Sequence, residues 1–329
     1  MPRLKQLTTW QLIHKSSQRN LPAMLLYVLE SHGSSPGRQG FLMAVNALGE
    51  MEGSVGGGIM EHKFVEMAKE KLKHDPAFQA TPELSIRTQY HDKTASRNQS
   101  GMICSGDQTI LLYRVQPNDL AAIQSIISCL EQNKNGLLEL SPSGIQFSDN
   151  QLPEVNYQFS MQSDDTWLYL ERLGYKNQLF IIGGGHCALA LSRIMSLMDF
   201  YIRVYDDRPE LHTMGLNDDV HEKIVVNSYG DLVDLIPSGE GKYVVVMTFG
   251  YRTDDLTIRA LLDKQLTYFG VLGSKTKISK LFGDYRAEGI EESKLNRIHA
   301  PIGLPINSQT PEEIAVSIAG EIIKVKNRN

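Results

Sequence analysis

The segment Phe180-Ile181-Ile182-Gly183-Gly184-Gly185-His186-Cys187-Ala188 most constrains how this chain can fold. It is a short apolar run that ends in a G-x-G-x-x-A pattern. In such a pattern Gly183 permits a tight turn, Gly185 lets the backbone approach a pyrophosphate, and Ala188 is small enough for a helix to pack on the sheet. The segment therefore predicts a strand, a glycine loop and a helix, in the order found in dinucleotide-binding folds.

Two residues near this loop are candidates for ligand contacts. Asp206 lies 21 residues after Gly185, at the end of a second apolar run, where a carboxylate can accept hydrogen bonds from a ribose diol. His186 stands at the mouth of the loop, where it either meets a phosphate or metal or is a solvated loop residue. The loop itself either binds a dinucleotide or serves only the fold.

The second half of the chain continues as short apolar runs that alternate with segments of helical pattern. The later apolar runs are 201–205, 224–226, 243–248 and 268–272. This alternation is typical of a parallel sheet covered by helices on both faces. Ser274 and Lys275 follow the last run, at the sheet edge where open α/β folds bind ligands. They either cradle a phosphate there or begin a capped helix with a solvated lysine.

The first half has a different pattern, with helical segments and strand-like runs in irregular order. The polar stretch 133–165 contains turn-forming sequences, and we place the connection between two domains there. We therefore expect an α/β protein with an N-terminal α+β domain, residues 1–150. A Rossmann-like domain with a doubly wound parallel sheet, residues 151–329, would follow it.

The first half also has a glycine-rich segment of its own, Gly53-Ser54-Val55-Gly56-Gly57-Gly58. Such glycines can adopt positive φ, so that successive amides form an anion-binding nest. Glu61 would fall in the next helical turn, where it either binds the edge of a heterocycle or complements the helix dipole. Arg38, on an upstream Ser-Ser-Pro-Gly-Arg loop, either makes a forked contact with phosphate or is a surface arginine.

Cys104 lies in a polar, glycine-containing stretch, whereas structural cysteines usually lie in apolar runs. A thiol in this setting could be a thiolate ligand or a sulfur carrier, although the sequence offers no obvious paired base. The chain has three cysteines and no CxxC pair, which argues against a disulfide scaffold and a structural zinc site.

Charge and hydropathy exclude further classes of protein. The net charge of −5 argues against a protein that binds nucleic acid by neutralising phosphates. The N-terminal segment lacks the pattern of a signal peptide, and the longest apolar runs are too short to span a bilayer. We therefore expect a cytoplasmic protein that has neither nucleic acid nor a membrane as its partner.

Six segments together resemble the XdhC/CoxI family, the accessory proteins of xanthine dehydrogenase and related molybdenum hydroxylases. They are Gly33–Pro36, Gly53–Glu61, Gly101–Cys104, Gly183–Ala188, Gly270–Lys275 and His299–Leu304. The resemblance implies a protein that binds the molybdenum cofactor (molybdopterin) transiently, protects it while its sulfido ligand is installed, and helps deliver it to an apo molybdenum hydroxylase. It also implies a homodimer and a cysteine desulfurase-type sulfur donor as a partner.

The resemblance further assigns roles by position. Cys104 matches the cysteine of the family's Met-x-Cys-Gly-Gly-like segment, and Glu61 matches the glutamate that follows its glycine run. Many relatives carry a second cysteine where this chain has Ile59, which argues against a mechanism with two thiols. Ser105 replaces a usual glycine, so the loop around Cys104 departs from the family's pattern.

We expect a cofactor site between the domains, with Cys104 as the ligand of the metal and no catalytic residue. The other expected cofactor-binding residues are Arg38, Ser54, Gly56, Gly57, Gly58, Glu61, Gly183, Gly185, His186, Asp206, Ser274 and Lys275.

Two other classes of function stay open. An NAD-dependent oxidoreductase would use the loop Gly183–Ala188 with Asp206, which favours NAD over NADP, but the sequence shows no clear catalytic set. Micromolar binding of NADH would support this class. A protein-interaction scaffold would use its glycine loops only structurally and would bind no small molecule.

Overall fold

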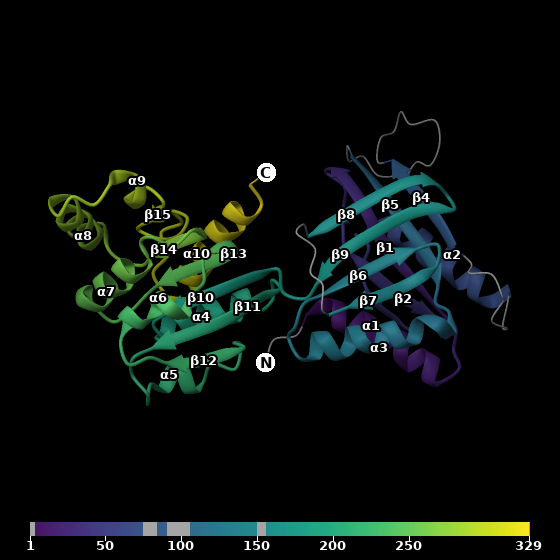
Figure 1. Cartoon of the computed structure of the whole chain (residues 1–329), viewed down its shortest axis with the longest axis horizontal. Helices are drawn as coiled ribbons and strands as arrows, with labels where there is room; N and C mark the ends of the chain where they lie inside the picture. Colours follow the sequence, from purple (N-terminus) through teal and green to yellow (C-terminus); the bar gives the residue numbers. More distant parts are fainter. Residues whose placement is uncertain (1–3, 75–83, 91–105, 150–155, 329) are drawn as a thin grey trace. The chain divides into compact units, whose positions relative to one another are not determined.

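A computed structural model of the chain describes residues 4–74, 84–90, 106–149 and 156–328 (Figure 1). The chain forms two compact units. We call them the N-terminal unit, Leu4–Gly174, and the C-terminal unit, which begins at Tyr175.

The N-terminal unit contains a five-stranded antiparallel sheet in the order β3-β2-β1-β5-β4. Its strands are β1 (Ala23–Gly33), β2 (Leu42–Asn46), β3 (Met51–Gly53), β4 (Leu84–Tyr90) and β5 (Gly106–Arg114). The central strand β1 is buried on both faces over residues 23–29, which explains its continuous apolar sequence. One face packs against α2 (Gly58–His74) through Met24, Leu26 and Val28.

A second antiparallel sheet completes this unit, in the order β7-β6-β9-β8. Its strands are β6 (Gly136–Ser141), β7 (Gly144–Ser148), β8 (Tyr157–Ser163) and β9 (Thr166–Leu173), and α1 (Lys5–Gln18) and α3 (Leu120–Glu131) pack side by side (Figure 1). The two sheets meet at the buried carboxylate of Glu171, whose Oε2 accepts hydrogen bonds from Tyr27 and Tyr169, each at 2.7 Å.

The second sheet corrects the expectation that residues 133–165 connect two domains. These residues contain all of β6, β7 and β8, and β6 and β8 both pair with β9. In β6 only alternate residues, Leu138 and Leu140 among them, are buried, so the strands read as polar in sequence. The boundary between the two compact units therefore follows Gly174 in the sequence, whereas we expected it after residue 150.

The C-terminal unit is a six-stranded parallel sheet in the order β12-β11-β10-β13-β14-β15. Its strands are β10 (Asn177–Ile182), β11 (Phe200–Asp206), β12 (Glu222–Val225), β13 (Gly239–Val246), β14 (Leu266–Val271) and β15 (Ile298–His299). One face is covered by α4 (His186–Met195) and α10 (Pro311–Lys326), and the other by α7 (Tyr251–Leu261) and α8 (Lys275–Ala287). This confirms the predicted fold class, an α/β protein with a Rossmann-like second part.

The strand order places a topological switch point beside β10. The chain leaves β10 toward β11 on one side and later returns to β13 on the other side. Ligands of open α/β sheets bind at the carboxyl ends of such strands. The short segments η1 (Pro117–Asp119), α5 (His212–Gly215), η2 (Tyr229–Asp231), α6 (Leu232–Leu235) and α9 (Glu292–Leu295) complete the chain. In the part that the structure describes, no helix combines the length and the apolar character of a membrane span.

Candidate functional site

In the N-terminal unit, two loops interlock at the end of the sheet where Gly33 of β1 pairs with Gly106 of β5. A Cβ atom on Gly37 would lie 2.1 Å from the carbonyl oxygen of Val55, so only glycine fits there. The amide of the fully buried Gln108 donates to the same carbonyl oxygen at 3.0 Å. The loop that carries Arg38 and the glycine-rich loop are thereby held together.

The glycine-rich loop forms a nest of amides, and the carboxylate of Glu61 fills it. The Oε2 atom accepts hydrogen bonds from Ser54 Oγ at 2.6 Å and from the amides of Val55 and Gly57, each at 2.9 Å. Three successive glycines adopt positive φ to make this turn, with values of 127°, 75° and 69° for Gly56 to Gly58. An internal anion therefore takes the place that the sequence suggested for an external one.

These hydrogen bonds also fix the charge of Glu61. Burial by itself would raise the pKa of the carboxyl, but the donors from Ser54 and the loop amides outweigh it and lower the pKa below its ordinary value. The second carboxylate oxygen, Oε1, has no hydrogen-bond partner among the described residues. Glu61 is thus a fixed, ionised acceptor with one oxygen available to a ligand.

Arg38 lies exposed on the neighbouring loop. Its Nη1 donates to the carbonyl oxygen of Gly33 at 2.9 Å, which leaves the rest of the guanidinium to solvent. Beside it, the side chains of His32 and Asp107 form a hydrogen bond of 2.8 Å. Arg38 is therefore placed within the same loop cluster as Glu61, as a cation at its surface.

Cys104, the expected metal ligand, lies outside the described residues. The structure describes the two other cysteines, Cys129 and Cys187, and burial raises the pKa of both thiols. A raised pKa keeps a thiol protonated and makes it a poor metal ligand. Within the described ranges, no three or more His, Cys, Asp or Glu side chains gather in a way that could hold a metal ion.

In the C-terminal unit, the loop after β10 makes a tight turn against the end of β13. Gly183 has a φ of 105°, and a Cβ atom on it would lie 2.4 Å from the carbonyl oxygen of Met247. Gly185 is extended and precedes α4, and a Cβ atom there would meet no atom within 4 Å. The backbone at Gly185 is therefore open to a ligand.

Asp206 holds this loop from inside the protein. Its side chain is fully buried, and Oδ2 accepts a hydrogen bond from the Gly184 amide at 2.7 Å. Arg208 provides the other donors, its backbone amide and Nε to Oδ1 and Nη2 to Oδ2. Burial would raise the pKa of Asp206, but the hydrogen bonds from Arg208 and Gly184 lower it. Each carboxylate oxygen thus has two donors within the protein, and sequence reasoning did not identify Arg208.

The other expected residues of this unit lie in helix starts. His186 is the exposed first residue of α4 and lines a groove of about 370 Å³ between α4 and α10. Ser274 caps α8, because its Oγ accepts a hydrogen bond from the Lys277 amide at 3.2 Å. Lys275 is exposed, whereas Lys277 pairs with the buried carboxylate of Asp254. No signal in the sequence indicated that Lys277 would turn inward.

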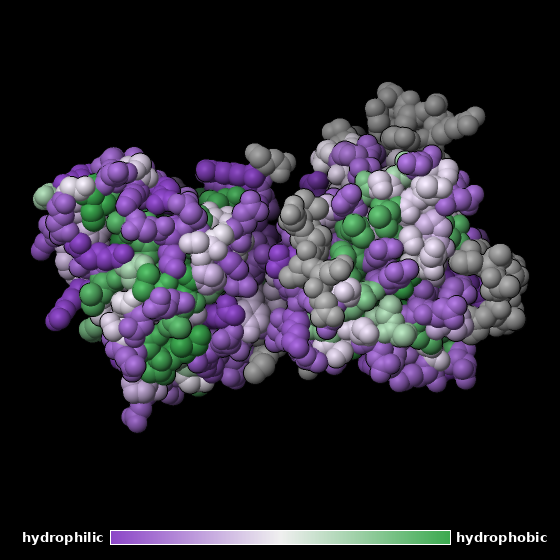
Figure 2. Space-filling view, in the orientation of Figure 1, coloured by the Kyte–Doolittle hydropathy of each residue, from purple (hydrophilic) through white to green (hydrophobic). Residues whose placement is uncertain are grey.

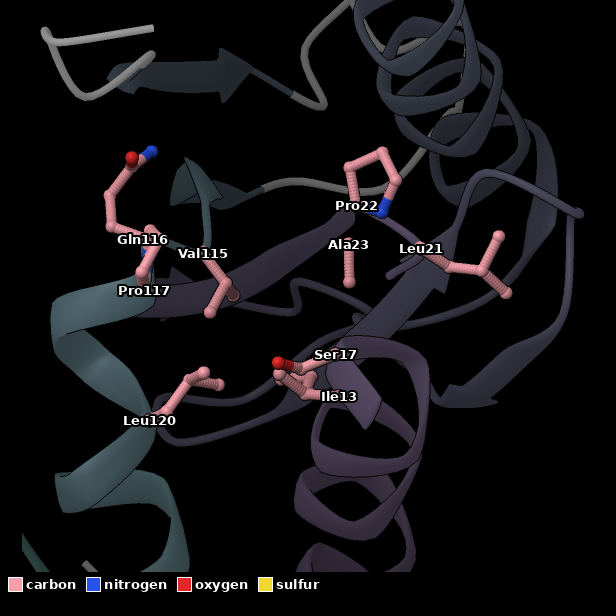
Figure 3. A pocket seen from close by; sticks show the side chains of 9 residues that line it. All are labelled: Ile13, Ser17, Leu21, Pro22, Ala23, Val115, Gln116, Pro117 and Leu120. Atoms are coloured by element: carbon pink, nitrogen blue, oxygen red, sulfur yellow. The ribbon is translucent and has the colours of Figure 1, made fainter. Parts of the chain in front are cut away.

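Most of the expected residues thus fall into two groups. Arg38, Ser54, Gly56–Gly58 and Glu61 belong to one loop cluster of the N-terminal unit. Gly183, Gly185 and Asp206 meet at the carboxyl end of the parallel sheet. A single site formed by both units stays a prediction. The small cavity in Figure 3, lined by apolar residues such as Ile13 and Leu120, measures about 20 Å³ and has room only for a water molecule.

Comparisons with known proteins relate this chain to several others. A curated protein of Escherichia coli (strain K12), named uncharacterized protein YqeB, is 23% identical over 315 residues, which are 95% of this chain and 45% of that protein. A protein of Bacillus subtilis (strain 168), named as a probable subunit of xanthine dehydrogenase, is 26% identical over 163 residues, 50% of this chain and 47% of that protein. The chain therefore spans less than half the length of these two relatives.

A solved structure shares the fold. The crystal structure described as a xanthine dehydrogenase from Bacillus halodurans matches with a TM-score of 0.69 at 23% identity, over 98% of this chain and 96% of that chain. Two family models match as well: that of the XdhC and CoxI family over residues 16–79, and that of the XdhC Rossmann domain over residues 179–322. With one match in each of its compact units, the chain belongs to the XdhC and CoxI family.

Proposed function

We propose that this protein is an accessory protein of a xanthine dehydrogenase-type molybdenum hydroxylase. It binds the molybdenum cofactor, protects it during sulfuration and assists its insertion into the apoenzyme. Membership of the XdhC and CoxI family supports the accessory role, as does the likeness to the B. subtilis protein named for xanthine dehydrogenase. A cysteine desulfurase-type protein would supply the sulfur, and the accessory protein would act as a homodimer.

The observation that carries the proposal is the ionised carboxylate of Glu61 in its nest of amides. A molybdopterin presents a heterocycle with N–H donors, and Glu61 Oε1 is an acceptor fixed in position for such an edge. The cofactor's phosphate suits the exposed guanidinium of Arg38. The amides of the nest are already occupied by Glu61, so we assign the phosphate to Arg38 and not to the glycines.

The residues of this cluster therefore fit the cofactor in two of its parts. Cys104 would be the thiolate ligand of the metal, because thiolates are soft ligands suited to such a centre. When bound, the cofactor supplies the molybdenum centre that receives the sulfido ligand. The protein's own part is to hold the heterocycle and phosphate and to limit the access of water.

The test is retention of molybdenum by the purified full chain. The protein is mixed with cofactor released from a molybdoenzyme and passed through a desalting column, and the molybdenum that coelutes is measured. Wild type should retain it, and Glu61→Ala and Cys104→Ala should each retain about tenfold less. Glu52→Ala is the matched control, because Glu52 is an exposed carboxylate on β3 of the same unit.

Two outcomes would contradict the proposal. If wild type retains no molybdenum, the protein is not a cofactor carrier. If Glu61→Ala retains as much as wild type, the loop cluster is not the site. A second measurement concerns the partner: the loaded protein should activate an apo molybdenum hydroxylase faster than free cofactor does, and an equal rate would remove the role in insertion.

A further inference from the structure

The C-terminal unit has a feature that the proposed function does not use. Figure 2 shows hydrophobic side chains on the visible face of this unit among mostly hydrophilic ones. Phe249, in the loop between β13 and α7, is 89% exposed, more than any other exposed large hydrophobic side chain of the described residues. A phenyl ring left in water forgoes the stabilisation that burial gives, and its full face is accessible to a ligand.

A continuous series of contacts joins Phe249 to the glycine loop. A Cβ atom on Gly183 would lie 2.9 Å from Thr248 Cα, so the loops after β10 and β13 touch. The Gly184 amide donates to Asp206, which is paired with Arg208. The guanidinium carbon of Arg208 lies 5.6 Å from the centre of the Phe249 ring. The ring therefore belongs to the carboxyl ends of β10, β11 and β13, where open α/β sheets bind ligands.

The charges around Arg208 indicate which part of a ligand would bind beside Phe249. Arg208 has the buried carboxylate of Asp206 on one side, and the carboxylate of Asp207 lies 4.0 Å from its Nε. These two anions offset the positive charge, so the position does not favour a phosphate. Nη1 of Arg208 has no hydrogen-bond partner among the described residues, and it can donate to a neutral acceptor.

We propose that Phe249 and Arg208 form a platform for a planar heteroaromatic ring of the purine or pterin type. The ring stacks on the face of the phenyl group that Arg208 does not cover, because the guanidinium lies over the other face. The inference does not depend on the proposed function, since a dinucleotide supplies such a ring. A pterin bound here would place that heterocycle at Phe249 instead of at Glu61. The inference also differs from the ribose contact expected of Asp206, whose oxygens are all engaged within the protein.

The experiment measures binding of two fluorescent probes, NADH and pterin, to the full chain. Phe249→Leu keeps an apolar side chain but removes the aromatic face, and it should weaken binding of whichever probe wild type binds by about tenfold. Phe249→Trp keeps a face and should bind within about threefold of wild type. Leu235→Ala is the control, because Leu235 is an exposed apolar side chain elsewhere in the same unit.

The outcomes separate the sources of the ring and the two proposals. Loss of NADH binding in Phe249→Leu supports a dinucleotide. Loss of pterin binding supports a pterin at this platform and contradicts the placement of the heterocycle at Glu61. Binding of neither probe to wild type, or equal binding by wild type and Phe249→Leu, overturns the platform. Circular dichroism shows whether the variants are folded. Failure of molybdenum retention by wild type would end the proposed function but would leave an NADH result standing.

Discussion

Asp206 and Arg208, two residues apart at the end of β11, form a forked ion pair, with Nε to Oδ1 and Nη2 to Oδ2 both at 2.8 Å. The carboxylate of this pair is fully buried and also accepts a hydrogen bond from the Gly184 amide. A side chain that the sequence suggests for ribose binding thus fastens the glycine loop to the sheet.

The first prediction concerns this carboxylate. Asp206→Asn removes the charge and replaces one acceptor with a donor, so Arg208 and the Gly184 amide lose part of their hydrogen bonding. We expect the free energy of unfolding to fall by about 2–3 kcal/mol. Urea denaturation at pH 7 measures it. Asp218→Asn, whose side chain is 92% exposed, should change stability by less than about 0.5 kcal/mol. Equal midpoints for the two variants would refute the prediction.

The second prediction concerns the interlocked loops of the N-terminal unit. Gly37→Ala would bring a methyl group against Val55 O and the Gln108 amide, and the free energy of unfolding should fall by about 2–3 kcal/mol. Gly283→Ala is the matched control inside α8, where a Cβ atom meets nothing within 4 Å. It should raise stability by about 0.5–1 kcal/mol. Urea midpoints that shift in the same direction would show that the loops are not tightly packed.

The third prediction is a pH dependence that arises from Glu321 of α10. Burial would raise its pKa, but hydrogen bonds from His299, Tyr268 and the Gly303 amide outweigh this and lower the pKa from 4.5 to about 2. The folded-state pKa is below the unfolded one, so the stabilisation is complete above pH 4.5 and is lost as the pH falls toward 2.

Glu321→Gln tests this. At pH 7 the variant should be less stable than wild type by about 3 kcal/mol, and the difference should shrink by pH 3. Urea denaturation at both pH values gives the two differences. Glu210→Gln, at an exposed carboxylate, should show little difference at either pH. A gap between wild type and Glu321→Gln that is the same at pH 3 as at pH 7 would exclude the carboxylate as its source.

The fourth prediction concerns His221, which stacks on Tyr201 with a ring distance of 4.3 Å and accepts a hydrogen bond from the Ile202 amide at Nδ1. Burial lowers the pKa of its imidazole to about 4. Protonation of His221 therefore opposes folding. The contribution of the neutral ring to the free energy of unfolding is complete above pH 6.5 and is lost as the pH falls through 4. Nitrogen-15 NMR should show a titration midpoint near 4 in the folded protein. A midpoint near the value for the urea-unfolded chain would rule out the buried, neutral ring.

The sequence predicted the C-terminal fold well because its signals are local. The run Phe180–Ala188 combines an apolar strand, a glycine turn and a small residue in the helix, and each of these depends only on near neighbours. The strands of the second antiparallel sheet were missed because they are short and are stabilised by pairing with one another. Gly136 of β6, for example, pairs with Leu173 of β9, 37 residues away. Pairing of that kind leaves little trace in composition.

The candidate site shows the same division. Positive φ at Gly56 to Gly58 was foreseeable from the residue type, and the structure has it. Whether Glu61 would face a ligand or its own loop depends on the path of the backbone, and so does the inward turn of Lys277. Phe249 gave no signal because one aromatic residue in a loop is ordinary until its exposure is known.

The carboxylate that fills the amide nest has one more consequence. Glu61 offsets the repulsion among the converging N–H dipoles even when no ligand is bound. The glycine-rich turn therefore does not need a ligand to keep its shape. A ligand that binds Glu61 therefore finds the loop already in its bound conformation. Binding then costs little conformational entropy, because the loop does not have to become ordered.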